Sequence, residues 1–234
     1  MAIPDSVRCA QALMHGRLKG SLLGSQQSED FLLLPTLLRT MPRGGTFVEL
    51  GALDGLTYSN TLVLERCFGW RGLLIEANPA NFAKLQRSGR SAIKMHAAIC
   101  REGASVSMSL SGGAMAAIVS EQPEHLKAAA QRKGYSNATV DVPCRSLSAL
   151  MDAASLPHAS MLSLDVEGSE RVVLDHADPA RFDLVLVESV GRDPAHSAHV
   201  HHRLLQGALS PARRLWVPGS DMCVTCHREF AILV

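Results

Sequence analysis

Residues Thr46–Asn60 read Thr-Phe-Val-Glu-Leu-Gly-Ala-Leu-Asp-Gly-Leu-Thr-Tyr-Ser-Asn, and this stretch decides the fold. An apolar run ends at Leu50 and is followed by Gly51 and Gly55, with Asp54 between them. This pattern is typical of a strand that leads through a tight turn into a helix, with backbone N–H groups and one carboxylate facing a ligand. It predicts the ligand-binding end of an open α/β sheet.

Short apolar strands alternate with helices from residue 46 onward. Alternation of this kind predicts a mainly parallel sheet covered by helices on both faces. The last two strands have no helix between them, which predicts an antiparallel hairpin at one edge. The predicted strands cover residues 46–50, 72–76, 92–99, 161–165, 184–188, 214–217 and 223–232. The predicted helices cover residues 57–67, 79–88, 147–154, 169–176 and 196–209.

The N-terminal segment precedes this alternation. It contains a predicted helix over residues 29–40, which ends before the Pro-Arg-Gly-Gly breaker at 42–45. We therefore expect a helical cap over residues 1–43 and one main domain over 44–234.

Residues 103–145 interrupt the alternation within the main domain. Strand-like segments at 106–110 and 139–143 flank a predicted helix over 121–133. We expect an insertion beside the third strand, in a position to face a substrate.

The bulk composition excludes several classes of protein. The 234 residues are 47% hydrophobic with a net charge of +1, and the basic residues are scattered, which argues against nucleic acid as a partner. No run approaches the roughly 20 apolar residues that span a bilayer, and the N-terminus lacks the pattern of a secretion signal. The six cysteines are spread too thinly for a disulfide scaffold, so we expect a reducing, cytoplasmic setting. The sequence leaves open whether the protein forms a homo-oligomer.

Polar residues at three strand ends are candidates for holding a ligand. Glu76 closes an apolar strand about 20 residues after Gly55, the distance at which a carboxylate accepts bonds from both ribose hydroxyls of an adenosine group. Residues 163–170, Ser-Leu-Asp-Val-Glu-Gly-Ser-Glu, bunch three carboxylates at another strand end. Taken singly, each feature also fits a structural turn or a helix N-terminus. Because ligands of open α/β sheets bind outside the carboxyl ends of the strands, we expect the three segments to meet at one site.

The glycine spacing narrows the ligand. The pattern Gly-Ala-Leu-Asp-Gly departs from Gly-x-Gly-x-x-Gly and has no third glycine, which favours a cofactor without a pyrophosphate. Together the motifs resemble those of the FkbM family of S-adenosylmethionine-dependent methyltransferases. The resemblance spans roughly residues 44–190, and the segments that carry it are 47–55, 59–61, 72–79, 96–99 and 163–170.

This resemblance implies a class I methyltransferase fold, a Rossmann-like three-layer α/β sandwich with a seven-stranded, mostly parallel sheet and an antiparallel C-terminal hairpin. It also implies that Gly51 and Asp54 face the methionine part of the cofactor, that Glu76 holds the ribose, and that Asp165 lies near the amino group or the reacting centre. Ala97 and Ala98 would flank the adenine. The implied cofactor-binding residues are Glu49, Gly51, Asp54, Gly55, Ser59, Asn60, Glu76, Ala77, Ala97, Ala98 and Asp165.

The activity implied is methyl transfer from S-adenosylmethionine to a hydroxyl of a small-molecule, sugar or lipid-linked acceptor. A poorly acidic hydroxyl needs a base. The first catalytic candidates are Asp165, Glu188 and His196. Glu167 and the other histidines of residues 196–202 are further candidates. A divalent metal is compatible with these histidines and carboxylates but is not predicted, because the histidines equally fit a solvated helix face.

Two other functions stay open. A nicotinamide-dependent oxidoreductase would also use Glu76, but it predicts a third glycine where the sequence has Leu-Thr-Tyr-Ser after Gly55. A non-catalytic module would keep the fold and bind S-adenosylmethionine without turnover. Cys223-x-x-Cys226-His227 is similar to a zinc or redox motif. In a strand these cysteines would point to opposite faces, so structural cysteines are predicted.

Overall fold

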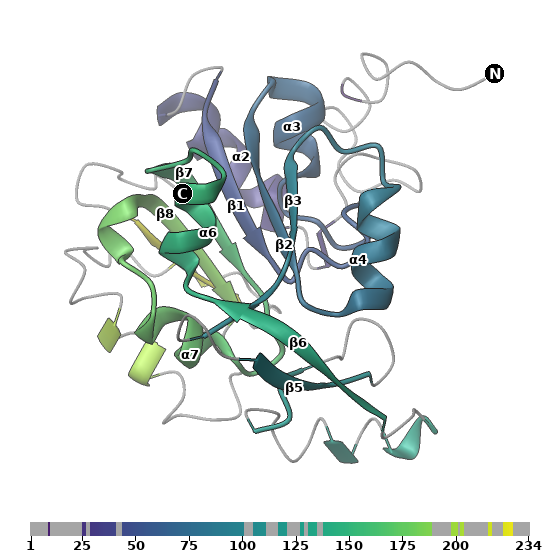
Figure 1. Cartoon of the computed structure of the whole chain (residues 1–234). Helices are drawn as coiled ribbons and strands as arrows, with labels where there is room; N and C mark the ends of the chain where they lie inside the picture. The colour runs from purple at the N-terminus through teal and green to yellow at the C-terminus, as the bar shows by residue number, and fades with distance from the viewer. Residues whose placement is uncertain are drawn as a thin grey trace.

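The computed structural model in Figure 1 describes residues 9, 25–26, 29–40, 44–100, 105–110, 117–120, 127–128, 131–134, 138–188, 198–200, 202–203, 215–216 and 222–226. Its strands are β1 (Thr46–Leu50), β2 (Arg71–Glu76), β3 (Ile93–His96), β4 (Ala98–Ile99), β5 (Ser105–Ser109), β6 (Thr139–Arg145), β7 (Ala159–Leu164), β8 (Phe182–Glu188), β9 (Leu215–Trp216) and β10 (Met222–Cys226). Its helices are α2 (Glu29–Thr40), α3 (Leu62–Phe68), α4 (Pro79–Gln86), α6 (Leu147–Ala153), α7 (Glu170–Asp175) and the short 3-10 helix η2 (Pro179–Arg181).

The main sheet has seven strands in the order β3-β2-β1-β7-β8-β10-β9. The five strands from β3 to β8 pair in parallel, whereas β10 is antiparallel to both β8 and β9. This arrangement confirms the fold class predicted from the sequence. Chain order reverses between β1 and β7, which makes their carboxyl ends the switch point where open α/β sheets bind ligands.

Successive side chains of the strands pack alternately into two hydrophobic layers, one on each face of the sheet. Phe47 on β1 belongs to the layer that α2 and α3 cover, and the next residue, Val48, belongs to the layer that α6 and α7 cover. Both side chains are fully buried. Because successive strand residues point to opposite faces, a strand buried on both sides reads as a continuous apolar run, as seen in the sequence.

The predicted third strand is split, which corrects the expectation for residues 92–99. The chain leaves the main sheet at Ala97, whose N–H donates to the carbonyl of Glu76 (3.3 Å), while His96 Nε2 bonds the carbonyl of Ala77 at 2.9 Å. The following residues form β4, which pairs with β6 in a second sheet of order β4-β6-β5. Figure 1 shows β5 and β6 below the main sheet, on the side where α7 lies. The expected insertion therefore builds a small sheet of its own.

The helix predicted over 57–67 begins only at Leu62. Tyr58 has a left-handed φ of 60°, and the Asn60 N–H and the Thr61 hydroxyl both donate to the carboxylate of Glu49. These contacts hold residues 58–61 in a loop. The other predicted elements lie within a few residues of the observed ones where they are described, and residues 127–128 and 131–132 of the predicted 121–133 helix are helical. Parts of the predicted 196–209 helix and 223–232 strand lie outside the described residues.

Four cysteines are paired, contrary to the expectation from their spacing. Cys9 is joined to Cys67 and Cys100 to Cys144, with Cα–Cα distances of 5.5 and 5.6 Å, within the range of disulfides. The partners are 58 and 44 residues apart in sequence. Their spacing in the sequence therefore did not predict that they lie close together in the fold. None of the described helices is long and apolar enough to cross a membrane.

Candidate active site

A pocket lies at the carboxyl ends of β1, β2 and β7, between the main sheet and the small sheet. Its polar part is formed by the loops that follow these strands, and its apolar part by β4, β5 and residues 117–118. The predicted cofactor-binding residues that line it are Glu49, Gly51, Asn60, Glu76, Ala77, Ala97, Ala98 and Asp165. Lining residues outside the predicted cofactor-binding set are chiefly Gln26, Tyr58, Met108, Ile118, Ser169 and the candidate base Glu167.

Glu49 organises the loop after β1. Its Oε1 accepts the N–H of Asn60 (2.9 Å), and its Oε2 accepts the hydroxyls of Ser59 (2.9 Å) and Thr61 (2.5 Å). Asn60 then donates from Nδ2 to the hydroxyl of Ser163 on β7 (3.0 Å). The carboxylate thereby fixes the segment that forms one wall of the pocket.

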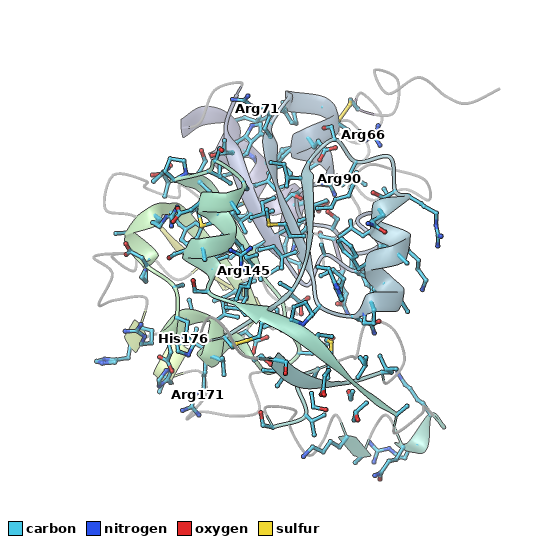
Figure 2. The ribbon with its side chains drawn as sticks, in the orientation of Figure 1. Arg66, Arg71, Arg90, Arg145, Arg171 and His176 are labelled. Atoms are coloured by element: carbon cyan, nitrogen blue, oxygen red, sulfur yellow. A yellow bond between two sulfur atoms is a disulfide. The ribbon has the colours of Figure 1, made fainter. Side chains whose placement is uncertain are left out.

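Arg90 supports the same loop from behind and was not singled out by sequence reasoning. Figure 2 shows it on the side of the molecule where α3 and α4 lie. Its buried guanidinium donates to Glu65 Oε2 (2.8 Å), the Gly55 carbonyl (2.7 Å) and the hydroxyls of Ser59 (3.0 Å) and Thr61 (2.9 Å). Because each of these acceptors receives a hydrogen bond from Arg90, a polar network with satisfied hydrogen bonds anchors the loop.

Three predicted cofactor residues, Asp54, Gly55 and Ser59, are not among the residues that line the pocket. Asp54 caps its own turn, since its Oδ1 accepts the N–H groups of Leu56 (2.9 Å) and Thr57 (2.7 Å). Burial alone would raise the pKa of Asp54, but these hydrogen bonds outweigh it and hold the pKa below its ordinary value. The carboxylate that was expected to face a ligand therefore stabilises the turn in this structure.

Gly51 is where the loop after β1 meets the loop after β7. It has a φ of 77°, and a Cβ at this position would overlap the carbonyl oxygen of Asp165. Glycine is therefore required both for the backbone conformation and for the close approach. The N–H of Gly51 is not directed at the pocket, because it donates to the carbonyl of Ile75 (3.1 Å).

Glu76 ends β2 and is buried beneath the pocket. Its Oε2 accepts the N–H of Leu53 (2.8 Å) and its Oε1 accepts the N–H of Asn78 (2.7 Å). Burial raises the pKa of Glu76 to about 7, because it outweighs the hydrogen bonds that favour the charged form. The side chain of Asn81 and the backbone of Ala77 also hydrogen-bond to this carboxylate.

The loop after β7 carries a second carboxylate anchor. Glu170 Oε1 accepts the N–H groups of Val166 (3.0 Å) and Gly168 (3.2 Å). Between them, Glu167 has a left-handed φ of 55°. Burial, followed by the negative charges of Asp165 and Glu170, raises the pKa of Glu167 to about 8.

Two buried polar atoms at the pocket have no hydrogen-bond partner within the chain. They are Asn60 Oδ1 and Ser169 Oγ, and both residues are more than nine-tenths buried. A buried polar atom without a partner costs free energy, so such atoms indicate a place for a polar ligand group or water.

The predicted catalytic residues do not assemble into one described cluster. Asp165 lines the pocket, Glu188 is the last residue of β8, and His196 lies outside the described residues. His199 Nε2 bonds Asp175 at the end of α7 (3.0 Å). In the part of the chain that is described, no group of three or more His, Cys, Asp or Glu side chains has the geometry to hold a metal.

Comparison with protein families places this site within a known domain. The sequence model of the methyltransferase FkbM domain matches residues 49–206, which is more than half of the chain. The match begins at Glu49 and includes every strand end that lines the pocket. A search of curated proteins gave no match.

Several solved methyltransferase structures are distantly similar to this chain. An FkbM methyltransferase from Methylobacillus flagellatus is 15% identical, with a TM-score of 0.46, and the match covers 79% of this chain but only 44% of that one. An O-methyltransferase from Bacillus cereus in complex with S-adenosylhomocysteine is 13% identical, with coverage of 94% and 86% and a TM-score of 0.39. A precorrin-6y C5,15-methyltransferase from Geobacter metallireducens is 11% identical, with coverage of 77% and 72% and a TM-score of 0.41.

Proposed function

The chain belongs to the FkbM methyltransferase family, and on that premise we propose that it transfers a methyl group from S-adenosylmethionine to a hydroxyl oxygen. The acceptor class that we propose is a small molecule, a sugar or a lipid-linked compound. The observation that carries the choice of cofactor is the charge of the pocket.

The described residues that line the pocket include four carboxylates and no lysine, arginine or histidine: Glu49, Glu76, Asp165 and Glu167. Opposite charges attract strongly where water is excluded, and like charges repel. The pocket therefore suits the sulfonium and ammonium groups of S-adenosylmethionine. It opposes the pyrophosphate of a nicotinamide dinucleotide, which makes the oxidoreductase alternative the weaker one.

The polar atoms and the apolar wall fit the two halves of this cofactor. Asn60 Oδ1, which lacks a partner, would accept a hydrogen bond from the ammonium group, and Asp165 lines the same pocket. Glu76 would accept hydrogen bonds from the ribose hydroxyls. Met108, Ile118, Ala97 and Ala98 all line the pocket, and they would enclose the adenine as an apolar wall.

When bound, S-adenosylmethionine supplies an electrophilic methyl group for an oxygen nucleophile. The residues of this chain would hold the two reactants in line and exclude water, and a carboxylate or imidazole would receive the hydroxyl proton. Asp165, Glu188 and His196 stay proposals for that role, and of these Asp165 lies in the pocket lining.

The N-terminal cap and the insertion are proposed to shape the acceptor side. Ser25 forms a parallel bridge with Tyr58, and Gln26 lines the pocket beside it. Tyr58 is 45% exposed and lines the pocket, so its aromatic ring would offer an apolar face to an acceptor. We keep the division into a cap over residues 1–43 and a main domain over 44–234 as part of this proposal.

The cytoplasm stays the compartment proposed from composition. The two cysteine pairs oppose it, because cytosolic proteins rarely keep disulfides. Counting free thiols on protein isolated under alkylating conditions would show whether the cysteines are reduced, as expected in the cytoplasm, or paired in disulfides.

Isothermal titration of the full chain with S-adenosylmethionine and with S-adenosylhomocysteine tests the cofactor. We expect both to bind, and we expect Glu76→Gln to weaken both by about tenfold, because it removes a charged acceptor for the ribose. Asp54→Asn is the matched control, since Asp54 does not line the pocket, and it should change affinity less than Glu76→Gln. Absence of binding by either ligand would overturn the proposal. Binding without turnover across hydroxylated acceptors would favour the non-catalytic module.

A further inference from the structure

The loop after β7 displays a carboxylate, Glu167, that the proposed function uses only for its charge. Glu167 lines the pocket and has a left-handed φ of 55°, and Gly168 follows with a φ of 104°. A residue with a side chain pays a penalty in this region, so the conformation persists only where the surroundings impose it.

Those surroundings are the two hydrogen bonds made by Glu170. Its buried Oε1 holds the N–H of Val166 on one side of Glu167 and the N–H of Gly168 on the other. Because the backbone is fixed on both sides, the position of Glu167 relative to the pocket is set by the fold.

The charged groups that act on Glu167 are the carboxylates of Asp165 and Glu170, and the described lining of the pocket contains no cationic side chain. Asp165 and Glu170 belong to its own loop, and Glu49 and Glu76 line the same pocket from β1 and β2. Burial and the charges of Asp165 and Glu170 disfavour the ionised form of Glu167 and raise its pKa to about 8. A positive charge in the pocket would reverse this effect.

The loop after β7 lies at the switch point of the main sheet. Ligands bind at the switch point, which here lies between β1 and β7, and Gly51 at the end of β1 touches the backbone of Asp165. If the cofactor lies there, Glu167 is the carboxylate in this loop that has a raised pKa and no hydrogen bond to the backbone of its neighbours.

We propose that Glu167 is ionised while the pocket holds the sulfonium cofactor and carries a proton once the pocket holds the neutral, demethylated product. This inference rests on the proposed function. In the transfer, the new C–O bond forms as the S–C bond breaks with its electron pair on sulfur. The hydroxyl proton passes to the carboxylate of Glu167 and later to water. The net charge of the pocket therefore stays constant while the sulfonium charge disappears.

The test needs no acceptor, because S-adenosylmethionine and S-adenosylhomocysteine differ only in the methyl group and its charge. Each is titrated calorimetrically at about pH 7.5 in two buffers of different ionisation enthalpy, which gives the protons released on binding. A group with a pKa of about 8 is mostly protonated there. We expect about half a proton more to be released with S-adenosylmethionine than with S-adenosylhomocysteine. Protons released from Glu76 are common to both ligands and cancel in the difference.

Glu167→Gln should abolish that difference and lower the preference for the charged ligand at high pH by about tenfold. Glu167→Gly serves as a second variant, since glycine accepts the left-handed backbone. Asp141→Asn is the control, because Asp141 is an exposed carboxylate on β6 outside the pocket lining. Equal proton release with the two ligands in the unmodified protein, or a difference that survives in both Glu167 variants, would overturn the inference. If neither ligand binds the unmodified protein, the proposed function itself fails.

Discussion

Two neighbouring loops treat buried carboxylates in opposite ways. On the β1 side, burial raises the pKa of Glu65, but the charge and hydrogen bonds of Arg90 outweigh it and hold the pKa below its usual value. On the β7 side, burial raises the pKa of Glu167, and Asp165 and Glu170 raise it further. The β1 side receives a cation, Arg90, from the segment between α4 and β3, whereas the described residues that line the pocket on the β7 side include no cation. A buried carboxylate that is paired with a cation stabilises the fold. A buried carboxylate without a cation can change its protonation state when a charged ligand binds.

Backbone strain occurs on both sides of the pocket. Four non-glycine residues in the described part of the chain have left-handed φ values, namely Leu53, Tyr58, Ser155 and Glu167, and all except Ser155 line the pocket. Strained residues persist where surrounding bonds hold them, and they cluster at functional sites. The hydrogen bonds made by Glu76 and Glu170 provide that support around Leu53 and Glu167.

The largest expected effect comes from removing the cation of the β1 side. Arg90→Leu would leave Glu65 and Glu49 buried without their partner and free three further acceptors. We expect a loss of about 3–5 kcal/mol in the free energy of unfolding, measured by urea denaturation. The buried carboxylates on the β1 side would then lack a cation, as Glu167 does on the β7 side.

Arg87→Leu is the matched control, because Arg87 is exposed at the end of α4. The same chemical change there should alter stability by no more than about 0.5 kcal/mol. Equal effects of the two substitutions would show that Arg90 does not anchor the loop.

The next effect concerns the contact between the two loops. Gly51→Ala would drive a Cβ into the carbonyl oxygen of Asp165 and force a φ of 77° on alanine. We expect a loss of about 2–4 kcal/mol, because clash and conformational strain add. Gly69→Ala separates the two contributions. Gly69 has a φ of 68° but nothing within 4 Å of an added Cβ, so it should lose only about 1 kcal/mol. A similar loss at both positions would mean that the loops do not depend on their contact.

The sequence predicted the frame of this site better than the roles of its side chains. The two-sided burial of Phe47 and Val48 follows from an apolar run between turn residues, which is a local signal. The exit of the chain at Ala97 depends on the carbonyl of Glu76, which is distant in sequence. Asp54 carried the right residue type for a ligand but caps its own turn, and Arg90 gave no local signal because its partners come from three segments. Local patterns predict elements, whereas partner choice depends on the assembled fold.

The pH dependence of stability tests whether the uncompensated carboxylates differ from the compensated ones. Glu76 and Glu167 have folded-state pKa values of about 7 and about 8, above the ordinary value of 4.5. Between these limits the folded protein binds more protons than the unfolded chain, so its free energy of unfolding falls as pH rises. We expect a loss of about 1–3 kcal/mol between about pH 5 and pH 8, measured by denaturation without ligand. Glu167→Gln should flatten the upper part of the curve. Asp54 and Glu65, whose pKa values are lowered, act only in acid and do not mask this window. A flat curve in the unmodified protein would contradict the assignment.

The smallest effect separates strain from charge at Glu167. Glu167→Gly and Ser155→Gly both place glycine at a left-handed position, with φ values of 55° and 54°, but only the first removes a carboxylate. Ser155→Gly should change stability by no more than about 0.5 kcal/mol, because relief of strain is offset by the greater freedom of glycine in the unfolded chain. At about pH 9, Glu167→Gly should be more stable than Ser155→Gly by about 1 kcal/mol, since the charge disfavoured by burial, Asp165 and Glu170 is gone. At about pH 5 the two should agree, because Glu167 is then protonated in the folded protein. An advantage that persists at low pH would mean that backbone strain, rather than the missing cation, distinguishes the β7 loop from the β1 loop.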